Sequence, residues 1–145
     1  MTSLTDLLLA DDRRPNAVRA LVEVVDAEVK GKRGLSGTAV KAAYATARKV
    51  SPTMAQRAID KMLPDFAAAL DPHWADFGGQ GDFGSFLAGR SEQVSAALLA
   101  VTDARVDKSS KEVLKKAYRS IRGKAKENVV EALPRVGGAI AGVCR

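Results

Sequence analysis

Residues 20–29 read ALVEVVDAEV, and residues 97–106 read ALLAVTDARV. Six of the ten aligned positions are identical, and they include the acidic residues Asp26 and Asp103. Apolar side chains recur every three or four residues through the first segment, which is typical of one buried face of an α-helix. They are Val18, Leu21, Val22, Val25 and Val29. The two segments therefore predict two related amphipathic helices.

The similarity continues beyond these helices, with matching residues in the same order. VKAAY at residues 40–44 corresponds to LKKAY at residues 114–118, Arg48 to Arg122, and Leu63-Pro64 to Leu133-Pro134. These matches predict an internal duplication, with a first repeat at residues 1–77 and a second at residues 78–145. The alternative is a chance resemblance between alanine-rich helices. The matched polar residues are expected either to join neighbouring helices or to form a twinned functional site.

The composition predicts an all-α fold in a single compact helical domain. The chain has 145 residues, the size of one domain, and 25 of them are alanine, the strongest helix former. No stretch alternates apolar and polar residues as a half-buried strand does. Pro64 and Pro134 are expected to break or kink their helices. The predicted helices span residues 4–10, 15–30, 37–49, 52–63, 65–70, 72–77, 82–88, 91–106, 110–127 and 128–143.

Several classes of protein are disfavoured by what the sequence lacks. One histidine and one cysteine cannot supply a disulfide framework or a zinc site of several thiolates or imidazoles. No nucleotide-binding or hydrolase motif occurs. The sequence thus predicts no cofactor, no metal site and no enzymatic activity. No apolar run approaches the ~20 residues of a membrane span, and the acidic N-terminal segment does not resemble a signal peptide. We therefore expect a cytoplasmic protein.

A basic stripe near the C-terminal end is the most distinctive feature. Eight lysines and arginines fall between residues 108 and 126, and only Glu112 opposes them, in a chain of net charge +6. On a helix, at about 100° per residue, six of the eight share one sector: Lys108, Lys111, Lys115, Arg119, Arg122 and Lys126. Like charges repel, so we expect an exposed face that attracts an anionic partner such as nucleic acid, an acidic protein or a membrane surface. The alternative is a solvated face without a partner.

Two weaker candidate sites precede the stripe. The glycine-rich segment 31–37 contains Lys32, Arg33, Gly34 and Ser36 before a predicted helix start, an arrangement that can bind phosphate. Its alternative is an ordinary connection between helices. Five of the seven aromatic residues lie between residues 66 and 86, beside the only histidine. His73 and Trp74 there predict a small-ligand pocket, and the alternative is a hydrophobic junction between the two halves.

The chain also resembles a family of small actinobacterial proteins of unknown function. The resemblance rests on SLTDLLL at residues 3–9, LSGTAVK at residues 35–41, LPDF at residues 63–66 with WADF at residues 74–77, and AVTDAR at residues 100–105. It runs through nearly the whole chain and implies a bacterial protein. It implies no activity and assigns no site residue.

Three functional hypotheses follow. The first is a non-catalytic helical binding or scaffold protein that recognises another protein, with a homodimer as one possible assembly. The second is a nucleic-acid-associated protein that binds the phosphate backbone through the stripe of residues 108–126. The third is a small-ligand binder at the aromatic junction. The salt dependence of nucleic-acid binding distinguishes the second hypothesis from the others.

Overall fold

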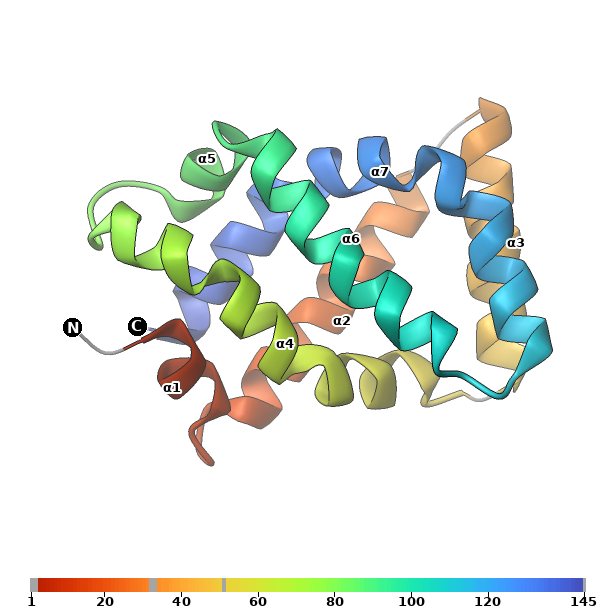
Figure 1. Cartoon of the computed structure of the whole chain (residues 1–145), viewed down its shortest axis with the longest axis horizontal. Helices are drawn as coiled ribbons and strands as arrows, with labels where there is room; N and C mark the ends of the chain where they lie inside the picture. Colours follow the sequence, from red (N-terminus) through yellow and green to blue (C-terminus); the bar gives the residue numbers. More distant parts are fainter. Residues whose placement is uncertain (1–2, 32–33, 51, 145) are drawn as a thin grey trace.

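The computed structural model describes residues 3–31, 34–50 and 52–144, and this part of the chain contains helices and no strand. The predicted all-α class is therefore confirmed. Seven helices are described (Figure 1): α1 Leu4–Leu9, α2 Arg14–Gly31, α3 Gly34–Val50, α4 Met54–Phe77, α5 Phe83–Ala88, α6 Ser91–Asp107 and α7 Glu112–Cys144.

The longest helix, α7, organises the arrangement. It contacts α2, α3, α5 and α6, and its first half lies beside α3 at one end of the molecule (Figure 1). Its second half packs against α5 and reaches α1 at the other end. Helices α4 and α6 also contact each other. The two predicted repeats are thus joined by many helix contacts.

Pro64 and Pro134 do not break their helices, which was one of the two effects expected of them. Helix α4 continues through Pro64 and Pro72, and α7 continues through Pro134. A proline inside a helix removes one backbone hydrogen bond and costs about 3 kcal/mol. Leu63 and Leu133, which directly precede two of these prolines, are fully buried. Packing of such side chains on both sides of each proline offsets the local cost.

A side chain caps the start of α1, whereas an aspartate inside α4 joins two helices. The hydroxyl of Ser3 accepts a hydrogen bond of 3.0 Å from the backbone nitrogen of Asp6. Asp71 directly precedes Pro72, where the sequence predicted a separate helix at residues 72–77. Its carboxylate instead accepts hydrogen bonds of 3.0 and 2.5 Å from the backbone nitrogen and hydroxyl of Thr5. Asp71 therefore ties α1 to α4.

The core lies where α1, α4, α5, α6 and α7 meet. The large side chains that are almost completely buried are Leu4, Leu8, Leu63, Leu70, Phe83, Leu87, Val94 and Leu133. In α2 the fully buried positions are Ala17 and Val24, whereas the predicted stripe from Val18 to Val29 is half-buried. The stripe is displaced because α2 packs against both α4 and α7, on more than one side.

Candidate polyanion-binding face

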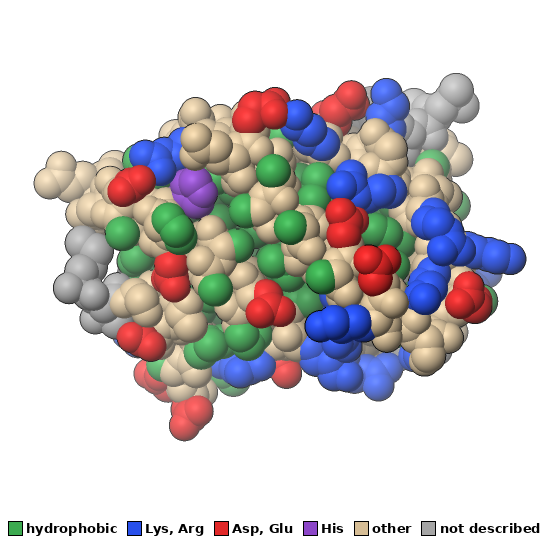
Figure 2. Space-filling model, viewed as in Figure 1, with side chains coloured by type: hydrophobic (Ala, Val, Ile, Leu, Met, Phe, Trp, Pro, Cys, Tyr) green, Lys and Arg blue, Asp and Glu red, His purple; other side chains and the backbone are tan. Residues whose placement is uncertain are grey.

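The basic stripe lies on the first half of α7 and on the turn before it. Lysine and arginine side chains gather at the end of the molecule where α3 and this part of α7 lie side by side (Figure 2). The chain reaches this end because α6 stops at Asp107 and α7 turns back to pack against α3. Of the six predicted stripe residues, the structure separates two from the other four.

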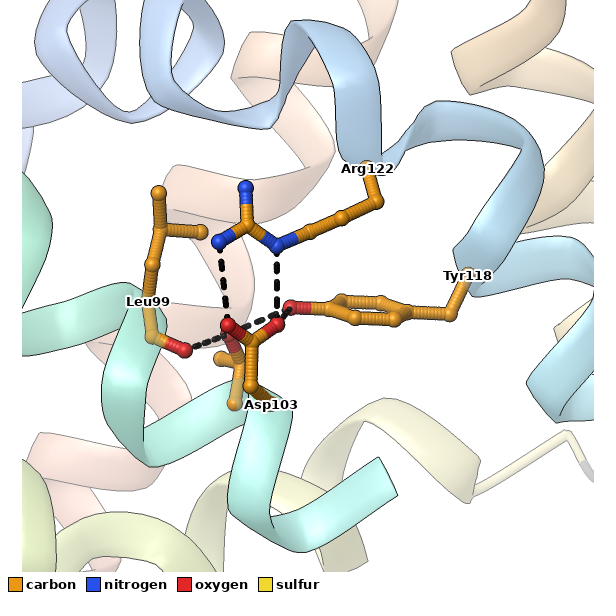
Figure 3. Close-up of polar contacts among 5 residues, drawn as sticks. Leu99, Asp103, Tyr118 and Arg122 are labelled. Atoms are coloured by element: carbon orange, nitrogen blue, oxygen red, sulfur yellow. Dashed lines mark hydrogen bonds and ion pairs between the residues drawn. The ribbon is translucent and has the colours of Figure 1, made fainter. Parts of the chain in front are cut away.

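Arg122 is half-exposed and is paired with an acidic residue of a neighbouring helix. Its Nε and Nη2 donate hydrogen bonds of 2.8 and 3.0 Å to the two carboxylate oxygens of Asp103 on α6 (Figure 3). The Tyr118 hydroxyl donates a third bond of 2.6 Å to the same carboxylate. Donation by Arg122 and then by Tyr118 holds the pKa of Asp103 below its usual range. The expectation that Arg122 has no acidic partner is therefore wrong, and its role in polyanion binding stays a prediction.

Lys126 is also matched by an acid. Its Nζ lies 2.5 Å from Oε2 of Glu92, at the start of α6. The prediction of Lys126 as an unneutralised member of the stripe is wrong for the same reason. In both cases the acid lies on α6, the helix that precedes α7 in the sequence. The pairing therefore follows from the packing of α6 on α7.

Five cations remain without a salt bridge to any described residue. They are Lys108, Lys111, Lys115, Lys116 and Arg119, and we call them the basic face. Lys115 is half-buried and the other four are exposed. Lys116 lies outside the helical sector of the predicted stripe, although it is one of the eight cations of residues 108–126. The members of the basic face are therefore defined by the lack of a salt bridge, and not by their position in one sector of the helix.

Helix α3 adds three exposed cations beside the basic face. Lys41, Arg48 and Lys49 form no salt bridge to a described residue. The guanidinium of Arg48 lies 5.8 Å from the centre of the Tyr44 ring. These residues could be found only after α3 was known to pack along α7, because they are about seventy residues away in sequence.

Tyr44 and Asp26 form a contact that resembles the one at Asp103. The hydroxyl of Tyr44 donates a hydrogen bond to the Asp26 carboxylate and joins α3 to α2. Burial, followed by this hydrogen bond and the negative charge of Asp26, raises the pKa of Tyr44 to about 12. Both tyrosine hydroxyls are therefore bonded to an aspartate between helices, as a packing role requires.

The glycine-rich segment is more helical than the sequence suggested. Helix α2 extends to Gly31 and α3 begins at Gly34, so Gly34 and Ser36 lie in the first turn of α3 rather than in a loop. Intrinsic helix propensity is a weak determinant once a helix packs against its neighbours. Lys32 and Arg33 lie outside the described residues. Phosphate binding by this segment stays a prediction.

The aromatic junction packs together as a hydrophobic cluster. The Trp74 ring packs edge-on against Phe83, with 4.9 Å between the ring centres. The ring centres of Phe77 and Phe83 are 5.0 Å apart. His73 is buried, and its Nδ1 lies 3.3 Å from Nη1 of Arg90. Burial and the positive charge of Arg90 lower the pKa of His73.

A surface hollow lies next to this cluster. It is lined by Asp76, Gly89, Arg90, Ser91, Glu92 and Gln93. Two of the lining residues form a salt bridge, with 2.7 Å between Nη1 of Arg90 and Oδ2 of Asp76. His73 and Trp74 do not line the hollow, so its geometry gives no support to their prediction as pocket residues.

Comparisons with known proteins identify a family for this chain, and that family has no known activity. The sequence profile of a family of unknown function matches residues 4–143. No curated protein and no solved structure matches the chain. Among the described residues, no three His, Cys, Asp or Glu side chains are grouped to hold a metal ion. No described helix has the length and apolar character needed to cross a bilayer.

Proposed function

The chain belongs to DUF6918, a family of unknown function, and from this premise we propose that it is a non-catalytic binding protein whose partner is a polyanion. The basic face of Lys108, Lys111, Lys115, Lys116 and Arg119 is the contact surface. The single observation that carries the proposal is that these five cations have no salt-bridge partner in the described chain.

The contrast within one helix supports this assignment. Arg122 and Lys126, further along α7, are matched by Asp103 and Glu92. The charge excess is therefore concentrated at one end of the molecule, and the exposed cations of α3 extend it (Figure 2). A cluster of one sign raises the local concentration of oppositely charged ligands and accelerates their association.

We further propose that residues 1–77 and 78–145 are two related halves. Two short helices support the match, because α1 and α5 each have six residues and each begins at a side-chain cap, Ser3 or Asp82. The buried Leu63 and Leu133 before prolines, and the two tyrosine–aspartate contacts, support it further. The basic face then distinguishes the halves, since Lys108 and Lys111 in the turn before α7 add to the three free cations that α3 and α7 each carry.

A reversal of charge on the basic face tests the function. The face variant combines Lys111→Glu, Lys115→Glu and Arg119→Glu. We expect wild-type protein to bind fluorescent inorganic polyphosphate at low salt, and the variant to lose at least about tenfold in affinity. Its melting temperature is expected to stay close to that of wild type, because exposed charges contribute little to stability. Fluorescence anisotropy and thermal denaturation measure the two effects.

A matched control separates the position of the charges from their number. Arg19→Glu, Lys30→Glu and Lys61→Glu change the net charge equally at exposed positions on α2 and α4. We expect this control variant to bind polyphosphate nearly as well as wild type. Absence of wild-type binding to polyphosphate at low salt, or an equal loss in the control variant, would overturn the proposed function.

A further inference from the structure

We infer that the polyanion is the backbone of double-stranded nucleic acid, bound without sequence preference. This inference rests on the proposed function and names the partner class of the same basic face. Three properties of the face support it: the spacing of its cations, the aromatic side chains that it lacks, and the amide side chains that it lacks.

The spacing favours a rigid ligand with closely spaced charges. Lys111, which directly precedes α7, is followed at intervals of four residues by Lys115 and Arg119 within the helix. At 1.5 Å per residue, this row is about 12 Å long. A duplex presents one negative charge per about 1.7 Å of its axis and a single strand one per about 3.4 Å, so the row lies beside about twice the axial charge density on a duplex. Because the row is fixed on a helix, it does not have to be ordered on binding.

The absence of a stacking surface disfavours single strands. Proteins that bind single-stranded nucleic acid stack the exposed bases on aromatic side chains. Tyr44 and Tyr118 are the only aromatic residues of α3 and α7, and their hydroxyls are held by Asp26 and Asp103 between helices. The other five aromatic residues lie between residues 66 and 86, in α4 and α5, toward the opposite end of the molecule (Figure 1).

The face lacks the amide side chains that read adenine, and its lysines and arginines are the residues that contact phosphates. Residues 34–50 and 108–126 contain no asparagine and no glutamine, the side chains that pair with adenine in the major groove. Contacts from lysine and arginine to phosphate position a protein on a duplex without reading its sequence. We therefore expect similar affinity for unrelated sequences.

A membrane surface is disfavoured by the same region. Helices that lie in a lipid interface insert a broad apolar face beside their basic residues. Val113, with 52% of its surface exposed, is the only large hydrophobic residue that is exposed in the described chain. One valine next to the cations is insufficient for such insertion.

The experiment compares duplex with single-stranded DNA and includes the other polyanions. Wild-type protein, the face variant and the control variant are titrated by anisotropy against two unrelated duplexes of about 24 base pairs and their separate strands, at several salt concentrations. Poly-L-glutamate and phosphatidylserine vesicles provide the acidic-protein and lipid comparisons. We expect both duplexes to bind equally, and at least about tenfold more tightly than the single strands at low salt.

The salt dependence reports how many phosphates are contacted. Five phosphate contacts give a slope of log affinity against log salt of about −4.5, and the face variant should reduce its magnitude by about 3. Equal or tighter binding of single strands, a preference for one duplex sequence, or tighter binding of poly-L-glutamate or vesicles would overturn this inference. Binding to polyphosphate through the basic face would still support the proposed function in each of those cases.

Discussion

Arg48 and Arg122 align with each other in the proposed duplication, yet only Arg122 reaches a carboxylate. Arg122 bonds both oxygens of Asp103, whereas Arg48 lies over the ring of Tyr44 and stays exposed. The sequence offered two interpretations of Arg122, as a matched polar residue that joins neighbouring helices and as a member of the free stripe, and its contact with Asp103 agrees with the first. The cations of the stripe could be located from the sequence, but which of them are neutralised depends on how α6 and α7 pack.

His73 gives the stability of the protein a defined dependence on pH. It is the only histidine of the chain, and its pKa is lowered in the folded state by burial and by Arg90. Below the unfolded pKa of about 6.5, the unfolded chain takes up a proton that the folded protein resists. We therefore expect the free energy of unfolding to decrease as pH falls below about 6.5, until the lowered pKa of the folded state is reached. Urea denaturation at intervals between pH 7.5 and pH 5, about the titration range of histidine, measures this decrease.

The variant His73→Gln identifies the source of this pH dependence. Glutamine keeps a polar group near Arg90 and does not titrate in this range. We expect the variant to have nearly constant stability between about pH 7 and pH 5. A slope equal to that of wild type would contradict the assignment to His73.

At the scale of the helices, the existence and type of most elements could be predicted, whereas their continuity could not. The cap at Ser3 and the periodicity of α2 and α6 are local properties of the sequence. The uninterrupted paths of α4 and α7 through their prolines depend on side chains buried by other helices. The close crossing of α5 and α7 also depends on packing between helices and not on the local sequence.

Gly84 and Gly137 allow α5 and α7 to approach with their backbones nearly in contact. A Cβ atom added at Gly137 would lie 2.4 Å from the Cα of Gly84, and one added at Gly84 would lie 2.4 Å from the carbonyl oxygen of Pro134. We expect Gly137→Ala to destabilise the protein by about 1–3 kcal/mol or more, because the backbones must separate. Thermal denaturation followed by circular dichroism measures the loss.

The neighbouring Gly138 provides the matched control. A Cβ added there meets nothing within 4 Å, and the residue is exposed. Gly138→Ala should stabilise the helix by up to about 1 kcal/mol, because alanine is the better helix former. If both variants had the same stability, the close crossing of α5 and α7 would be incorrect.

At the scale of the whole molecule, the charge asymmetry and the core follow different principles. The basic face is confined to the end formed by α3 and the first half of α7 (Figure 2). The core instead extends across both predicted halves, since α7 packs on α2 and α3, and α4 packs on α6. The single-domain prediction and the related halves are therefore compatible, because each half buries its apolar surface against the other.

This interlocking predicts that the two halves unfold together. Trp74, the only tryptophan, reports on the aromatic junction, whereas the helical signal in circular dichroism reports on all helices. We expect the two signals to give coincident urea transitions, as in a two-state domain. Leu63→Ala and Leu133→Ala, at corresponding and completely buried positions, should each shift both signals together and cost about 2–5 kcal/mol. Separate transitions in wild type, or a shift confined to one signal in either variant, would mean that the halves are independent units.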